Sequence, residues 1–250
     1  WTLSTSDLTL DGAQVILNIN QDGGQISAVQ MDIPKALNYV PLFEIPEKIQ
    51  LNGLRADWSW EGTWDQWVLN FDTKNTALNY NGIAVPSLSC TGQWIWGAVP
   101  ELSIPSLALE TNTGKITGSL ELKGDAPTLY TNLEGGSNLS ELFDFVETDL
   151  LVNPMGFWKG DNISLTQGFR SWEDFTPVGN PIFKGDISFF EGAFALASSN
   201  ISFEKVEAEL GIDGRNIQID RCFLQSGENT AVVTGTIYNA LEADGYPKVV

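Results

Sequence analysis

The sequence contains no histidine, only two cysteines and only 13 basic residues among its 250 positions. Without histidine the chain cannot build a Ser-His-Asp or Cys-His nucleophile, an HExxH zinc site or a histidine general base. Cys90 and Cys222 are too few for a disulfide framework and form no CxxC motif. We expect two buried free thiols, with a single long-range disulfide as the alternative.

Basic residues are scarce relative to acidic ones. The 32 acids against 13 bases leave a formal net charge of −19, which argues against nucleic acid and anionic membrane surfaces as partners. No apolar run approaches the roughly 20 residues of a membrane span. The chain begins at Trp1 with neither a Met nor a signal-like segment. We interpret it as a piece of a longer extracytoplasmic bacterial protein.

Glycine and apolar residues are abundant, whereas charged residues make up only 18% of the chain. Apolar positions alternate with polar ones, as at Val15, Leu17 and Ile19, and turn signals such as Asp22-Gly23-Gly24 separate the runs. The pattern predicts an all-β fold. We expect a long curled antiparallel meander that forms an open groove, or else a flattened barrel or sandwich.

One segment departs from this alternation. Apolar residues recur at helical spacing in "LSELFDFV", with Asn138 or Ser140 as a possible N-cap and Pro154 beyond the end. The spacing predicts a short helix over 139–150, which could plug one open end of a β structure or connect two β stretches.

An internal repeat relates Val85–Leu122 to Phe203–Asn239. Both copies carry apolar residues at one spacing, followed by a Thr-Gly pair: Leu102, Ile104, Leu107, Leu109 and Thr117-Gly118 in the first, and Ile217, Ile219, Cys222, Leu224 and Thr234-Gly235 in the second. Stacked repeats of this kind complete one another's core. We therefore predict one continuous β-rich repeat domain over 1–250, with possible sub-units 1–132 and 133–250.

No motif predicts chemistry. Asn18, Asn20 and Asp22 resemble the start of a calcium loop, but Val29 stands where a bidentate acid is needed, so a hairpin turn is favoured. Acidic neighbours such as Glu61 and Asp65 arise easily among 32 acids and do not indicate a glycosidase pair. We predict a protein that is not an enzyme, with no catalytic residue, no metal site and no cofactor.

Four of the nine tryptophans fall within "DWSWEGTWDQW". Strand alternation on either side of a predicted Glu61-Gly62 turn places the aromatic residues on faces continuous with aliphatic ones. The predicted groove lining is Trp58, Trp60, Trp67, Leu69, Phe71, Trp94 and Trp96. Trp64 falls just past the turn and is the candidate for an exposed aromatic. A sugar-binding platform is the alternative.

From about Thr128 to Asn239 the sequence resembles the C-terminal part of AsmA-like proteins. The resemblance is carried by the helical "NLSELFDFV", the strand "GDNISLTQG", and three further units listed here: "KGDISFFEGAFAL" from Lys184, "ISFEKVEAELGID" from Ile201 and "VTGTIYN" from Val233. In the first half, "NGIAVPSLSCTGQW" and "KITGSLELKG" resemble the family more loosely.

This resemblance implies a curled sheet with an open apolar groove that takes phospholipid acyl chains. It also implies a periplasmic, cell-envelope location, an inner-membrane anchor in the full-length protein, and a role in phospholipid transport or outer-membrane assembly. Two other hypotheses remain: a carbohydrate-binding β module that uses exposed tryptophans, and an envelope scaffold whose β core is only structural.

Overall fold

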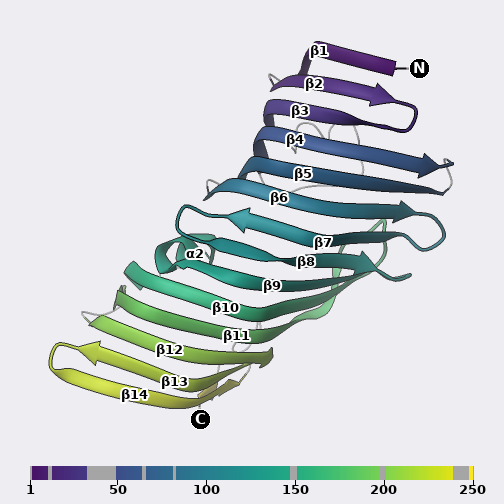
Figure 1. Cartoon of the computed structure of the whole chain (residues 1–250). Coiled ribbons are helices and arrows are strands. Elements are labelled where there is room, and N and C mark those ends of the chain that lie inside the picture. The colour runs from purple at the N-terminus through teal and green to yellow at the C-terminus, as the bar shows by residue number, and fades with distance from the viewer. Residues whose placement is uncertain are drawn as a thin grey trace. The chain divides into compact units, whose positions relative to one another are not determined.

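The computed structural model describes residues 2–10, 13–32, 49–63, 66–80, 83–146, 151–197, 201–238 and 248–249. Fifteen strands form one antiparallel sheet in which spatial order equals sequence order, from β1 to β15 (Figure 1). β1 and β15 stand at opposite ends of that order and do not pair, so the sheet is not closed. The predicted all-β open meander with one short helix is confirmed.

The strands of the first half are β1 (Thr2–Leu10), β2 (Ala13–Asn20), β3 (Gly23–Asp32), β4 (Ile49–Gly62), β5 (Trp67–Tyr80), β6 (Ile83–Trp96), β7 (Glu101–Glu110) and β8 (Lys115–Lys123). The second half holds β9 (Thr128–Asn138), α2 (Leu139–Val146), β10 (Leu151–Phe169), β11 (Pro177–Leu196), β12 (Ser202–Gly214), β13 (Asn216–Ser226), β14 (Asn229–Tyr238) and β15 (Lys248–Val249). None of the helices within the described ranges is long and apolar enough to cross a membrane.

The chain divides into two compact units. Unit 1 comprises residues 1–112 and 117–125, and unit 2 comprises residues 113–116 and 126–250. In unit 1 a small core forms around Val15, Ala28 and Leu54, which come from three successive strands and lie side by side in register. Strand pairing between sequence neighbours thus builds the core directly from residues on one face.

The predicted helix is present but is described only for Leu139–Val146, and residues 147–150 lie outside the described part. Asn138 directly precedes it, yet its side-chain oxygen Oδ1 is buried without a hydrogen-bond partner, so it does not cap the helix. Instead, the Asn138 amide donates to Thr113 Oγ1 at 2.9 Å, and that hydroxyl donates to the Glu141 carboxylate at 2.7 Å. Thr113, which lies just before β8, therefore links the residue that precedes α2 to the first turn of the helix.

The repeat is explained by a β-bulge in its middle strand. In β7, Ile104 and Pro105 together lie opposite Gly92, because Ser103 and Ser106 pair with Gln93 and Thr91. In β13 the extra residue is Asp220, since its neighbours Ile219 and Arg221 pair with the adjacent residues Leu210 and Glu209. The bulge adds one residue to the spacing of the apolar positions. Residues an odd number of positions apart, such as Ile219 and Cys222, therefore face the same side.

The turn between β4 and β5 lies later in the sequence than predicted. Glu61 and Gly62 do not form the turn, because both pair with β5, and the connection lies between Thr63 and Gln66, whose backbones hydrogen-bond to each other. Gly62 has a φ of 122°, and a Cβ there would stand 2.3 Å from the Gln66 carbonyl oxygen, so glycine is needed for the close approach.

The segment resembling a calcium loop is a hairpin, as predicted. The Asn20 side-chain oxygen accepts hydrogen bonds from the amides of Asp22 and Gly23 at 2.8 and 3.0 Å. An Asx turn of this kind closes the connection between β2 and β3 with the backbone itself.

The bulge generates a testable prediction. Deleting Asp220 should turn Cys222 and Leu224 to the polar face or force β13 out of register, because side-chain direction alternates strictly along a strand. We expect the free energy of unfolding to fall by about 2–4 kcal/mol, measured by urea unfolding followed by circular dichroism. Asp220→Ala keeps the residue count and should change it by less than about 0.5 kcal/mol. Equal effects of the two variants would contradict the role of the bulge.

Candidate functional site

The first candidate site is the aromatic face of unit 1. Trp58 pairs with Phe71 and Trp60 with Leu69, and Leu69 and Trp67 pair in turn with Trp94 and Trp96. Directly paired residues share a face of an antiparallel sheet. The structure therefore brings all seven predicted lining residues to one face of β4, β5 and β6.

Three tryptophans of this face pack against one another. The ring centroids of Trp67 and Trp94 lie 5.5 Å apart, and Trp96 lies 6.2 Å from each. Trp60 and Trp96 remain 36% and 38% exposed. The face is thus continuous and apolar, with two rings accessible at its surface. Trp64, the predicted exposed aromatic, lies outside the described residues, as does Asp65.

The two cysteines are free and half-buried. Cys90 pairs with Thr73 and Leu107 on the aromatic face of unit 1, and Cys222 pairs with Ala208 and Val233 in unit 2. Burial raises the pKa of both thiols above the usual range, and for Cys90 a hydrogen bond involving Thr73 opposes the increase. A thiol with a raised pKa is a poor nucleophile at neutral pH.

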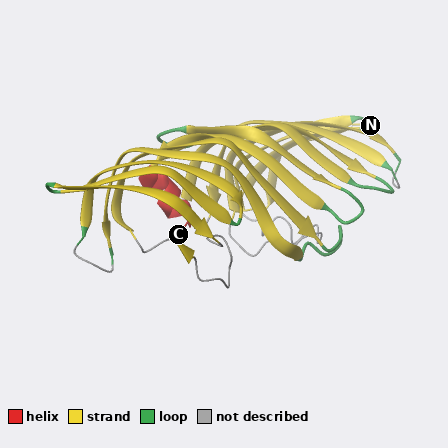
Figure 2. Cartoon of the chain, turned by 90° about the horizontal axis from the view of Figure 1, so that it is seen from below, coloured by secondary structure: helices red, strands yellow, loops and turns green. Residues whose placement is uncertain are grey.

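The second candidate site is a cavity of about 400 Å³ within unit 2. Its lining is almost entirely apolar and comes from the first residues of β8, which belong to unit 2, from β9 to β12 and from α2. The lining residues are Ile116, Leu133, Glu134, Gly135, Leu142, Trp158, Gly160, Ile163, Phe183, Ile187 and Ile212. Figure 2 shows α2, in red, on the inner side of the curved strands of this unit. This volume lies within the range of small-molecule sites.

Two paired glycines form part of the cavity wall. Gly160 lies directly opposite Gly135, so two adjacent positions of β9 and β10 carry no side chain. A Cβ on Gly160 would stand 2.8 Å from Ile163 Cγ1 and 3.2 Å from the Trp158 ring, so the glycine lets these two side chains pack closely over the strand. A Cβ on Gly135 would stand 2.1 Å from the Lys115 carbonyl oxygen, so glycine there permits close approach of the neighbouring backbone.

The wall of the cavity is held in place by a buried hydrogen bond. Trp158 Nε1 donates to Ser137 Oγ at 3.0 Å, and Ser137 is only 5% exposed. Leu139 at the start of α2 is buried as well. The indole is thus fixed with its polar atom satisfied and its ring toward the cavity.

The opposite face of unit 2 carries charged side chains, together with the exposed, stacked rings of Phe157 and Phe190. Lysines there form ion pairs with carboxylates on the same or the next strand: Lys159 with Asp161 at 2.8 Å, Lys184 with Asp213 at 3.6 Å, and Lys205 with Glu207 at 3.0 Å. Such exposed pairs add little stability, but they show which face is in contact with water. The sheet is therefore amphipathic, with the cavity on its apolar side.

Sequence reasoning identified the aromatic face but not the cavity. The signal for Ile187 was available in the alternation of "KGDISFF", and Leu142 was recognised as part of the helix. No sequence pattern says, however, that a helix lies over Gly135 and Gly160, because that requires the register of β9 with β10.

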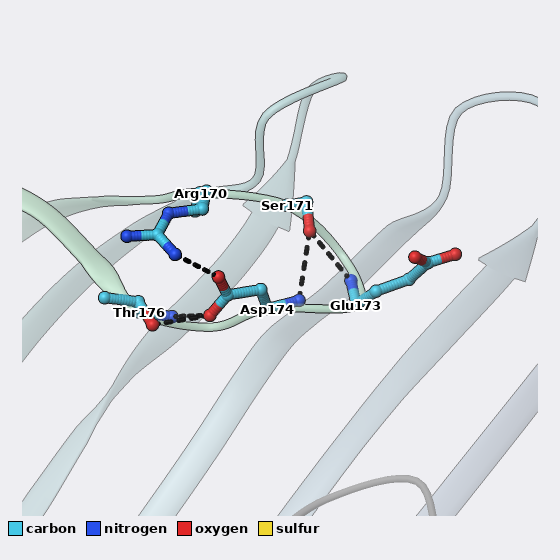
Figure 3. Close-up of polar contacts among 5 residues, drawn as sticks. All are labelled: Arg170, Ser171, Glu173, Asp174 and Thr176. Atoms are coloured by element: carbon cyan, nitrogen blue, oxygen red, sulfur yellow. Dashed lines mark hydrogen bonds and ion pairs between the residues drawn. The ribbon is translucent and has the colours of Figure 1, made fainter.

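An ordered loop joins β10 to β11 (Figure 3). Arg170 donates to the Asp174 carboxylate at 2.7 Å, and both the amide and the hydroxyl of Thr176 donate to its other oxygen. Ser171 Oγ accepts from the amides of Glu173 and Asp174 at 3.3 and 3.0 Å. The hydrogen bonds from Thr176, aided by Arg170, hold the pKa of Asp174 below its usual range. The Asp174 carboxylate thus links Arg170 and Thr176 within the loop.

A second prediction follows from this carboxylate. A depressed pKa stabilises the loop above the ordinary aspartate pKa of about 3.9, and this contribution is lost as pH falls through the lower folded value. We expect Asp174→Asn to speed limited proteolysis within 170–176 at neutral pH several-fold. Glu173→Gln, whose carboxylate points away from the contacts in Figure 3, is the control with the same charge change. Unchanged cleavage of Asp174→Asn would refute the assignment.

No protein-family model, curated protein or solved structure matches this chain. The resemblance to AsmA-like proteins therefore stays a prediction from the sequence. Within the described ranges, no group of three or more histidine, cysteine, aspartate or glutamate residues could hold a metal ion. The geometry on which a function can be argued is thus the apolar face of each unit.

Proposed function

We propose that this chain is a non-catalytic lipid-handling protein of AsmA-like type, which shelters phospholipid acyl chains in the bacterial periplasm. The observation that carries the proposal is the cavity of about 400 Å³ between α2 and the strands of unit 2, lined by Trp158, Ile163 and Ile187 among other apolar residues. Its ligand would be an acyl chain of a phospholipid involved in outer-membrane assembly or homeostasis.

The chemistry of the cavity suits a hydrocarbon chain. Burying each methylene contributes about 0.8 kcal/mol and requires no directed hydrogen bond. The only charged residue of the lining is Glu134, within β9. A polar ligand would lose its hydrogen bonds to water and find few groups in the cavity to replace them. An acyl chain forms no hydrogen bonds with water and so has none to lose. The site therefore favours an apolar ligand without requiring one particular lipid.

The aromatic face of unit 1 supports the same function independently. Trp58, Phe71 and Leu69 form part of a continuous apolar surface, and Trp60 and Trp96 are partly exposed on it. An accessible surface of this type is where an acyl chain can gain contact area. The face of unit 2 that carries ion pairs remains available to water, consistent with the net charge of −19.

The proposal is tested by a pair of substitutions on one strand. Ile187→Glu places a charge in the cavity, and Ile182→Glu makes the same change on β11 at a side chain that is 49% exposed and is not part of the cavity lining. We expect Ile187→Glu to lower bound phospholipid at least tenfold, measured by lipid extraction and native mass spectrometry, while Ile182→Glu retains it. Circular dichroism of both variants checks folding.

Two outcomes would reject acyl-chain binding by this cavity. One is a wild-type protein that carries no lipid after mild purification and takes none from phospholipid vesicles. The other is equal retention of lipid by Ile187→Glu and Ile182→Glu when both are folded.

The exposed rings of Trp60 and Trp96 favour carbohydrate binding as a second candidate function, since flat aromatic surfaces can stack on ligands. Titration of a glycan panel followed by tryptophan fluorescence tests it. A sugar site predicts quenching that is lost in Trp96→Ala, and the absence of quenching by every glycan would refute it.

A further inference from the structure

A smaller hollow lies on the face of unit 2 opposite the cavity. Its volume is about 220 Å³, and the residues that line it include Ser188, Phe190, Glu207, Glu209 and Arg221. Ser188 pairs with Glu209, and Glu209 pairs in turn with Arg221. Because directly paired residues share a face of an antiparallel sheet, these three form one row across β11, β12 and β13.

The strand ladder is interrupted on both sides of the hollow. The register of β11 with β12 shifts just after Phe189, so Phe190 and Glu191 together lie opposite one residue of β12. Glu191 has a φ of 54°, in the left-handed region that few non-glycine residues adopt. The bulge at Asp220 interrupts β13, and bulges commonly redirect side chains next to functional sites. The Phe190 ring is 42% exposed, and its centroid lies 5.8 Å from that of the stacked Phe157 ring.

The polar side chains of the row are available to a ligand. Among the residues that the structure describes, no hydrogen bond or ion pair engages the side chains of Ser188, Glu209 or Arg221. Glu207, by contrast, is paired with Lys205 at 3.0 Å. The row therefore offers guanidinium donors, carboxylate acceptors and a hydroxyl that can both donate and accept. The opposite charges of Glu209 and Arg221 make it neutral as a whole.

This chemistry favours a neutral ligand that carries several hydroxyl groups. An anion would be repelled by Glu207 and Glu209 in a chain of net charge −19, and a simple cation would be repelled by Arg221. A sugar hydroxyl both donates and accepts, so sugar hydroxyls can satisfy the carboxylate and the guanidinium together. The apolar side of a sugar ring can pack on the exposed Phe190 ring.

The size of the hollow limits the ligand. Its volume of about 220 Å³ lies below the roughly 300–1,000 Å³ of sites for drug-sized ligands. It therefore suits one sugar ring, either free or as part of a longer glycan.

We propose that this hollow binds one sugar residue of a neutral glycan, with Phe190 packed on the ring and Glu209 and Arg221 hydrogen-bonded to its hydroxyls. The site stands whether or not the cavity on the other face holds an acyl chain. It is also separate from the tryptophan surface of unit 1, because every residue that it uses belongs to unit 2.

The test is titration of ¹⁵N-labelled protein, followed by amide and indole NMR signals. The probes are the methyl glycosides of glucose, galactose, mannose and N-acetylglucosamine, together with a disaccharide of each. We expect saturable shifts of the backbone amides of Ser188, Glu209 and Arg221, while the indole signals of Trp60 and Trp96 stay unchanged. Equal affinity for a monosaccharide and its disaccharide indicates a site for a single ring, and tighter binding of the disaccharide indicates a site for a longer glycan.

Variants then assign the binding to this hollow. Glu209→Ala removes the free carboxylate, and Glu204→Ala is the matched control, since it makes the same change at an exposed position of β12 outside the hollow. Phe190→Ala removes the packing surface without changing a charge. We expect Glu209→Ala and Phe190→Ala to raise the sugar dissociation constant at least fivefold and Glu204→Ala to leave it unchanged. Circular dichroism checks that each variant is folded.

Four results would overturn the proposal. They are the absence of saturable shifts with every sugar probe, shifts confined to the indoles of Trp60 and Trp96, equal dissociation constants for folded Glu209→Ala and Glu204→Ala, and tighter binding of inorganic phosphate or tetramethylammonium than of any sugar.

Discussion

Backbone hydrogen bonding between sequence neighbours is the interaction on which the rest of this protein depends. Each strand from β2 to β14 pairs with the strand before it and the strand after it, and β1 and β15 stand at the two ends of the order. Hydrophobic burial is modest, because among the residues that the structure describes only seven hydrophobic side chains are buried. A ladder of local antiparallel pairs can form without a large closed core, and it leaves the apolar face of the sheet open for other contacts.

Register converts this ladder into an amphipathic surface. Trp58, Phe71 and Leu69 share a face because they pair directly or lie two residues from a paired position. Where the spacing of apolar residues is odd, as from Ile219 to Cys222, the bulge at Asp220 restores the alignment. The same device occurs at Pro105 in β7, where an imino acid is tolerated because the ladder is already interrupted. The repeat is therefore a repeat of side-chain direction as well as of sequence.

The cavity lies between the strands of unit 2 and the helix. Gly135 and Gly160 pair on adjacent strands in its wall, and Leu142 of α2 contributes to the same lining. The strands of unit 2 and α2 together form the site. Its lining is apolar apart from Glu134, which fits the proposed role in holding an apolar ligand. On the other face Lys184 and Asp213 form an ion pair across adjacent strands.

The sequence by itself determined the all-β class, the meander, the short helix near Leu139 and the common face of the seven aromatic and aliphatic residues from Trp58 to Trp96. These features follow from periodicity, which each strand carries locally. The sequence pattern predicted the turn at Glu61-Gly62, a pair that is common in turns. In the structure both residues still pair with β5, and the turn lies between Thr63 and Gln66. Only the tertiary structure decided that the sheet stays open, that Thr113 rather than Asn138 ties down the helix, and that Gly135 meets Gly160 beneath it. These features depend on the register between strands and on the position of the helix over them. Residues distant in sequence come together in this way only when the backbone hydrogen bonds between the strands have formed.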